Sequence, residues 1–417
     1  MRNLKKIFIV LTLIVFSAAL VFAGGRGGTP SGKANLLVSV WAGPHADLQK
    51  TVSRDYAQAN VTIDDVDYGN LKQKQLTSFQ AVSGSGNYDV VWVNSQWMKE
   101  YVDAGYIVPI DDYIKSAGLD LNIYAKGLLD GCVFNGKTYG LPTFAQTLIL
   151  AYDNEAFTKA GVKVPANAEE LVTAAKYFKE HGSGIAIPAR QGTAAVTLFS
   201  QLLFSDGGDF FDNNGKLTIN SPAAIYAADV YDRLVSYGLE GVTAWHHDET
   251  AEAVRMKNAP IGTIMSGLAN QNADPERSLI VNTVKYAPLA GKSGKAAATN
   301  SFWVWAVAKN APDPAAAAAY CVWMSSPETE KKQTLADQQI SAVNALSADR
   351  DVLAKAPFLP VVMEQLANGK IEPPLVSFNA LKADLVVALS EIATTNASPA
   401  DVLGRLQTKY ENTDFSK

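Results

Sequence analysis

The chain has 417 residues, of which 48% are hydrophobic and 18% are charged, so it can bury a large core and is not intrinsically disordered. Acidic residues (41) outnumber basic residues (36), and this balance argues against a nucleic-acid-binding protein. Two cysteines and four histidines exclude a disulfide-dense scaffold and a four-cysteine zinc site, and we expect neither a metal nor a cofactor.

Residues 1–23 are typical of a secretory signal peptide. Arg2, Lys5 and Lys6 precede the apolar run Ile7–Val21, and a cleavable site follows at Ala23. The run is shorter than the roughly 20 residues that a membrane-spanning helix needs, although an N-terminal membrane anchor is the alternative. We therefore expect a secreted, periplasmic protein. The sequence leaves open whether Cys132 and Cys321 form a disulfide.

The first part of the mature chain alternates strands with helices. Strands are predicted at 36–41, 61–68 and 88–93, and helices at 47–59, 70–82 and 95–104. This alternation favours a parallel, doubly wound sheet, in which ligands bind beyond the carboxyl ends of the strands. The loops Trp41–His45 and Asn94–Trp97 are therefore the first candidates for a binding site.

The pattern restarts after Pro142, without an internal repeat or a low-complexity linker. Strands are predicted at 147–152, 184–188, 260–265, 281–288 and 302–305. Helices are predicted at 168–180, 196–205, 222–237 and 314–324, from Pro327 onward, and over 380–410 with a break at Ser398-Pro399. This order predicts two α/β domains joined by short crossings.

Two motifs suggest chemistry but have simpler explanations. Residues 131–138 fit the phosphate-loop pattern, yet no buried strand precedes them and Tyr139-Gly140-Leu141-Pro142 cannot begin a helix, so we predict a hairpin around Asn135-Gly136. His246-His247-Asp248-Glu249 lacks metal-ligand spacing and favours a helix start capped by Asp248. No nucleophile motif occurs, and the protein is predicted not to be an enzyme, although a glycosidase with two carboxylates far apart in sequence is not formally excluded.

Tryptophans lie at predicted strand ends, loops and segment starts rather than in helical core stripes: Trp41, Trp97, Trp245, Trp303 and Trp305. Aromatic faces pack on the apolar faces of sugar rings, and planar polar side chains bond their hydroxyls. Core packing is the alternative for each tryptophan taken singly. The alternation in residues 302–305 predicts that Trp303 and Trp305 share one face of a strand.

Several segments, taken in order, resemble the cluster-one extracellular solute-binding proteins of bacterial ABC importers, the maltose-binding-protein-like group. The matching segments are residues 88–93, 101–113, 136–142, 152–161, 206–211, 220–222 and 325–328. The resemblance implies two discontinuous α/β domains around a ligand cleft, as in type II periplasmic binding proteins. It implies an N-terminal lobe of residues 34–142 and 287–340 and a C-terminal lobe of residues 143–286 and 341–417. The hinge would lie near Pro142–Gln146, Tyr286–Pro288 and Gln338–Ala342.

The same resemblance implies that a neutral carbohydrate binds in the cleft and that the closed form docks on the membrane permease, with the protein a monomer. The ligand-binding residues implied by position or by residue type are Trp41, Asn94, Gln96, Trp97, Phe144, Gln146, Arg190, Asp209, Trp245, Asn270, Trp303 and Trp305. Arg190-Gln191-Gly192 resembles the branch associated with sugar alcohols and small sugars, although Arg190 can equally be a surface residue.

One departure bears on ligand length. Relatives often carry an aromatic residue where this chain has Ser266–Asn270, which argues against a long oligosaccharide. Two other functions stay open at this point: a secreted enzyme that acts on carbohydrate, and a binding protein for peptides, amino acids or oxyanions. An anion site would need basic residues and amide-rich helix starts at the strand ends, whereas Trp41 and Asn94–Trp97 offer aromatic rings and amides.

Overall fold

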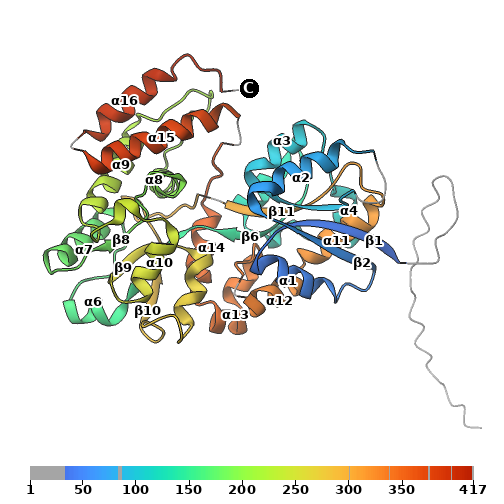
Figure 1. Ribbon diagram of the computed structural model, residues 1–417, viewed down its shortest axis with the longest axis horizontal. Coiled ribbons are helices and arrows are strands. Elements are labelled where there is room, and N and C mark those ends of the chain that lie inside the picture. Colours follow the sequence, from blue (N-terminus) through green and yellow to red (C-terminus); the bar gives the residue numbers. More distant parts are fainter. Residues whose placement is uncertain are drawn as a thin grey trace, which may run out of the picture. The chain divides into compact units, whose positions relative to one another are not determined.

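The computed structural model describes residues 33–82, 87–299, 301–337, 339–373, 376–395 and 397–415 (Figure 1). The signal peptide expected at 1–23 lies outside these residues. Residues 34–417 form one compact unit that contains two main sheets. Within the described ranges, no helix is long and apolar enough to cross a membrane.

The first sheet has five strands in the order β2-β1-β3-β11-β6. Their bounds are β1 Ala34–Trp41, β2 Ala59–Val66, β3 Val90–Asn94, β6 Leu141–Gln146 and β11 Ser301–Val307. Strands β1, β2 and β3 are parallel, as predicted, but β11 runs antiparallel to both β3 and β6. The parallel arrangement predicted from the first three strands is therefore confirmed, and β11 adds an antiparallel strand whose direction was not predicted. In the chain, β11 comes after β10 of the second sheet. It is not joined to a neighbouring strand of the first sheet by a helical crossover, the connection that parallel strands require.

The second sheet has four strands in the order β10-β7-β9-β8. They are β7 Leu148–Asp153, β8 Ile185–Ala186, β9 Ile261–Met265 and β10 Val284–Ala287, close to the predicted ranges. Strand β7 is antiparallel to both of its neighbours, and only β8 and β9 pair in parallel. Sequence alternation identified these strands, but it could not fix their direction.

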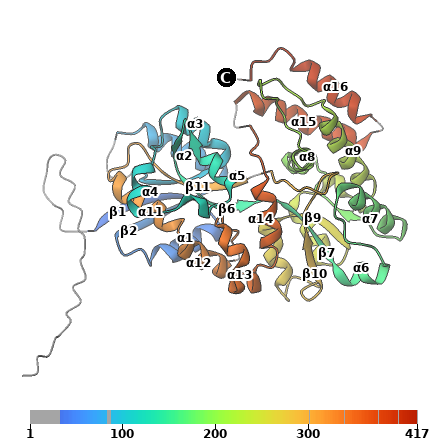
Figure 2. The same cartoon turned by 180° about the vertical axis from the view of Figure 1, so that it is seen from behind.

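Sixteen α-helices occur in the described part of the chain (Figures 1 and 2). Their bounds are α1 Pro44–Ser53, α2 Tyr68–Gln80, α3 Met98–Asp103, α4 Asp111–Ala117, α5 Lys126–Leu129, α6 Asn154–Ala160, α7 Ala168–Glu180, α8 Thr193–Ser205, α9 Pro222–Ser236, α10 His247–Arg255, α11 Pro314–Met324, α12 Pro327–Asp337, α13 Arg350–Lys355, α14 Leu359–Ala367, α15 Val376–Thr394 and α16 Pro399–Lys409. Helices α8, α9, α15 and α16 lie together in both views and pack on one another, whereas α1 packs on α12.

Helix starts follow local capping chemistry. The side chain of Asn167 accepts a hydrogen bond from Glu170 N (2.9 Å) and begins α7 at the predicted residue. Asp313 caps α11 through Ala316 N (3.0 Å), with Pro314 at a position that needs no amide hydrogen. Helix α10 begins at His247, so Asp248 lies in its first turn and not at the predicted cap.

Two further predictions have clear outcomes. The hairpin is confirmed: Val133–Phe134 pairs with Lys137–Thr138, and Asn135 and Gly136 both have positive φ, at 51° and 72°. The helix expected over 47–59 is wrong at its C-terminal end, because Ala59 already pairs with Ala34 in the first sheet. The pairing of eight residues of β2 with β1 outweighs the helical spacing that extends to residue 59.

The chain leaves the first sheet at Gln146 and enters the second at Leu148. Buried polar side chains satisfy the backbone here. Gln201 accepts hydrogen bonds from Thr147 Oγ1 (2.9 Å) and Leu148 N (3.1 Å) and donates to Leu148 O (2.7 Å). Ala145 N donates to Ile340 O (3.1 Å), so β6 and the segment around Ile340 are in contact. Gln338, at the start of the third expected crossing, lies outside the described residues.

Cys132 and Cys321 are both buried and are not bonded to each other. Burial without a stabilising positive charge raises the pKa of each thiol well above its usual range. We therefore expect no reaction of the native protein with a disulfide thiol reagent at pH 8. Both thiols should react after unfolding, and a reductant should leave the melting temperature unchanged. A native thiol count of one or two, or a melting temperature lowered by reductant, would contradict this arrangement.

Candidate functional site

Aromatic rings gather at one edge of the first sheet. The rings of Trp41 and Trp303 are stacked with their centroids 5.6 Å apart, and the Trp92 ring stacks on Trp303 with a centroid distance of 4.6 Å. Tyr68 stacks on Trp97 at 5.9 Å, and Trp97 meets Trp303 edge-on at 6.0 Å. We call Trp41, Tyr68, Trp92, Trp97 and Trp303 the aromatic cluster.

The topology explains why residues so far apart in sequence meet here. Strand β1 ends at Trp41, β2 ends two residues before Tyr68, and β3 ends at Asn94, so these parallel strands deliver their carboxyl ends to one edge. Strand β11 runs the opposite way, and Trp303 near its start pairs with Asn94. The predicted loops therefore do converge.

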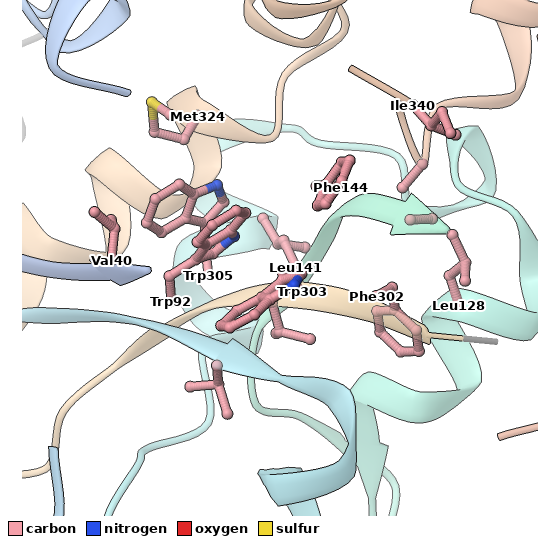
Figure 3. Close-up of a cluster of buried hydrophobic side chains, with 14 of the residues drawn as sticks. Val40, Trp92, Leu128, Leu141, Phe144, Phe302, Trp303, Trp305, Met324 and Ile340 are labelled. Carbon is pink, nitrogen blue, oxygen red and sulfur yellow. The ribbon is translucent and has the colours of Figure 1, made fainter. Parts of the chain in front are cut away.

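The cluster has a buried layer and an accessible layer. Trp92 is fully buried and Trp303 is 4% exposed, whereas Tyr68 is 46% exposed and Trp41 and Trp97 are half-buried. Trp303 and Trp305 share one face of β11, as predicted, because both stack on Trp92; Figure 3 shows these three indoles together, with Phe302 lying apart toward Leu128. Trp305 has no exposed surface and stacks on Trp92. It can therefore affect a ligand only indirectly, by its contact with Trp92.

Phe144 and His45 pack beside the cluster. Phe144, from β6, is 1% exposed and lies 4.4 Å from the ring of half-buried His45 near the start of α1. Burial lowers the pKa of His45 below its usual value, an effect that the negative charge of Asp337 partly opposes. His45 Nδ1 is buried and has no hydrogen-bond partner among the described residues. In its neutral form this imidazole donates one hydrogen bond and accepts one, so Nδ1 can do either, according to the tautomer.

Amide side chains lie next to the rings. Asn94 is buried, and its Oδ1 accepts from Gln96 N at 3.0 Å, which fixes the short 3₁₀ helix Ser95–Trp97. Gln96 is exposed, and its Nε2 donates to Glu372 Oε2 at 3.2 Å. Glu372 also pairs with Lys382 on α15, and both charged side chains are largely buried. This pair connects the loop after β3 with helix α15.

The predicted residues outside the first sheet's edge are more scattered. Gln146, at the end of β6, lies against Gly267, where an added β carbon would come within 3.1 Å of its amide. Asn270 borders a small pocket with Gln271, Ala273, Asp274 and Arg277. Arg190 is exposed, and its backbone N donates to Trp245 O at 3.0 Å, so these two residues are neighbours.

Asp209 is already engaged in an ion pair. Lys370 Nζ lies 2.8 Å from Asp209 Oδ2 and also donates to Gly208 O at 3.0 Å. This residue is therefore neutralised locally, and it is available to a ligand only alongside Lys370. None of these contacts joins Arg190, Asp209 or Asn270 directly to the aromatic cluster.

Sequence reasoning missed two residues of this region. Tyr68 follows the end of β2 and could have been found by the strand-end rule that identified Trp41. Glu372 precedes a proline in a segment without periodicity, and nothing in the sequence places it beside Gln96.

Two lysines near the cluster are paired with acidic side chains. Lys72 pairs with Glu100 (2.6 Å) and lies 5.9 Å from the Trp97 ring centroid, and Lys382 pairs with Glu372. Among the described residues, no group of three histidine, cysteine or acidic side chains could hold a metal ion. The arrangement thus offers ring faces, amides and locally neutralised charges.

Comparison with known proteins places this geometry in context. A family model for bacterial extracellular solute-binding protein matches residues 43–331. A probable amino-acid ABC transporter periplasmic-binding protein of Sinorhizobium fredii is 23% identical and aligns over 89% of this chain and 88% of its own length. A solute-binding protein of Agrobacterium radiobacter, solved with ribitol, superposes with a TM-score of 0.75 at 24% identity over 93% of this chain and 100% of its own. Maltose-bound MalE3 of T. maritima gives a TM-score of 0.75 at 20% identity, over 90% and 98% of the two chains.

Proposed function

The chain belongs to the bacterial extracellular solute-binding proteins, and we propose that it binds a neutral carbohydrate or polyol on the aromatic cluster and delivers it to an ABC importer. The carrying observation is the aromatic cluster itself, in which Trp41, Tyr68 and Trp97 keep accessible surface over the buried Trp303 and Trp92. Ring faces of this kind pack on the C–H faces of sugars.

The electrostatics around the cluster support a neutral ligand. Lys72 and Lys382 each lie within an ion pair with an acidic side chain, so their charges are locally balanced. A charged ligand would have to compete with these pairs, whereas hydroxyl groups can bond the amides without disturbing them. The ribitol and maltose present in the two similar structures agree with this ligand class.

The proposed mechanism is a shift between open and closed forms. The lobes would comprise residues 34–142 with 287–340, and residues 143–286 with 341–417. The hydrogen bond from Ala145 N to Ile340 O, which joins two of the expected crossings, supports a hinge at that place. A ligand that binds the closed form more tightly would populate it, and the permease would recognise that form. A cleaved signal peptide at 1–23 would deliver the protein to the periplasm.

An amino-acid ligand is the second candidate, because the Sinorhizobium relative carries that name. A zwitterion needs a free cation and a free anion at suitable separation. Arg190 is exposed and could supply the cation, but the acidic side chains Glu100 and Glu372 beside the aromatic cluster are already paired.

A thermal-shift screen tests the proposal. The mature protein, from Gly24, is first partly unfolded and dialysed to remove copurified ligand and is then screened against sugars, polyols, amino acids and inorganic anions. A ligand at 100 times its dissociation constant should add about 2.7 kcal/mol to the free energy of unfolding. We expect a shift with one carbohydrate or polyol class and no product on prolonged incubation. A shift only with amino acids or anions would contradict the ligand class, and turnover would indicate an enzyme.

A further inference from the structure

Glu372 occupies an unusual place beside the proposed binding surface. It lies in the segment between α14 and α15, and the two residues before it contact the loop after α8 and the 3₁₀ turn after α5. Lys370 bonds Asp209 and Gly208, whereas Ile371 lies so close to Gly131 that a β carbon there would come within 2.3 Å of its Cδ1. Glu372 itself is only 4% exposed. The segment thus places the carboxylate of Glu372 beside the loop that follows β3.

The hydrogen bonds of Glu372 are unevenly shared between its two oxygens. Oε2 accepts from Gln96 Nε2 at 3.2 Å and from Lys382 Nζ. Oε1 is buried and has no partner among the described residues. A buried acceptor without a donor loses its hydration without compensation, so a donor that reached this oxygen would be bound favourably.

The bond to Glu372 also fixes the orientation of Gln96. A glutamine amide has a donor end and an acceptor end, and the carboxylate accepts only from the donor end. The backbone of Gln96 is held by Asn94 Oδ1, and the neighbouring Ser95 Oγ accepts from Phe302 N at 3.4 Å. With both anchors in place, Gln96 Oε1 has no hydrogen-bond partner in the described part of the chain, and Gln96 directly precedes Trp97 of the aromatic cluster.

We propose that Glu372 is a positioning residue, which orients Gln96 so that this part of the site presents hydrogen-bond acceptors. The site thereby selects ligands that donate hydrogen bonds, such as neutral polyhydroxyl compounds, over their carboxylate analogues. The specificity half of this inference rests on the proposed function. Lys382 neutralises Glu372, so the acceptor surface does not require a cationic ligand. A carboxylate on the ligand would face Gln96 Oε1 and Glu372 without a donor from either.

Two substitutions that break the same ion pair separate positioning from general structural support. Glu372→Gln removes the carboxylate that orients Gln96, whereas Lys382→Met leaves it in place. Affinities are measured by calorimetry for matched pairs: ribitol with D-ribonate, D-mannitol with D-mannonate, and maltose with maltobionate. Glu391→Gln, which breaks the exposed Glu391–Arg405 pair (2.6 Å) at the end of α15, is the control for an unrelated pair.

We expect the wild-type protein to prefer the neutral member of the pair that it binds by at least 100-fold. Glu372→Gln should reduce this preference at least tenfold, while Lys382→Met and Glu391→Gln should retain it. Equal weakening of neutral and acidic ligands in Glu372→Gln, or loss of the preference in Lys382→Met, would overturn the inference, because a merely structural ion pair predicts those results.

A second measurement tests the positioning in the wild-type protein without a ligand, and a variant is used only for assignment. The side-chain amide signals of ¹⁵N-glutamine-labelled protein are recorded, and that of Gln96 is assigned by its loss in Gln96→Asn. It should exchange its protons at least tenfold more slowly than the amide of Gln73, which is also exposed. Exchange as fast as that of Gln73 would overturn the positioning. If no neutral probe binds, the proposed function fails, and this measurement still decides how Gln96 is held.

Discussion

Trp303→Ala should weaken ligand binding at least tenfold, which is about 1.4 kcal/mol, and should also lower the free energy of unfolding by about 3–5 kcal/mol. Both effects follow from its position, 4% exposed between the rings of Trp41 and Trp92. Removal of the indole leaves a cavity, and it also removes the ring on which the accessible Trp41 stacks. Calorimetry with the ligand found by the screen measures the loss of affinity, and urea denaturation measures the loss of stability.

Two matched variants separate the roles of the layers. Tyr68 is 46% exposed, so Tyr68→Ala should weaken binding while it changes the free energy of unfolding by less than about 1 kcal/mol. Trp305 is fully buried, so Trp305→Phe should reduce stability and leave the affinity within about twofold, since it reaches the ligand only through Trp92. Unchanged affinity in a folded Trp303→Ala variant would remove Trp303 from the site.

The sequence was informative where local patterns are strong. Helix α7 and the strands β7 and β9 fall within a residue or so of their predicted bounds, because capping residues and apolar runs mark their ends. The direction of β11 could not be predicted in this way. Parallel and antiparallel strands show the same alternation of side chains, and the direction depends on where the chain returns from.

The candidate site shows the same division. The strand-end rule found Trp41, Asn94 and Trp97, because parallel strands bring their carboxyl ends to one edge. It did not reveal that Trp305 lies beneath Trp92, since the face of a strand does not indicate depth. Glu372 depends on a contact between residues 276 positions apart, and such contacts leave no mark in a single sequence.

Glu330 is a buried acid whose protonation should affect the stability of the fold. It lies on α12 with no exposed surface, and its Oε1 accepts from Thr143 Oγ1 at 2.7 Å, in the strand that leads out of the first sheet. Its Oε2 is buried without a partner among the described residues. Burial raises the pKa of Glu330 to about 7, and hydrogen bonds from Thr143 and Ser341 only partly oppose this rise.

A raised pKa in the folded state makes the protein bind more protons folded than unfolded between about pH 4.5 and 7. The free energy of unfolding should therefore fall as the pH rises through this range, by about 3 kcal/mol for Glu330 alone. Below this range the group is protonated in both states, and above it the group is charged in both, so the loss is then complete.

Glu330→Gln should remove this loss. The amide is neutral at every pH, and its oxygen can still accept from Thr143. The difference in free energy of unfolding, variant minus wild type, should therefore be about 3 kcal/mol larger at pH 8 than at pH 4. Urea denaturation at both pH values measures this difference. Glu328→Gln on the same helix is the control, because the Glu328 side chain is 85% exposed and its substitution should leave the pH dependence unchanged. A difference between Glu330→Gln and wild type that is the same at pH 4 and pH 8 would show that Glu330 is ionised at ordinary cost in the folded protein, and that water or a donor reaches its second oxygen.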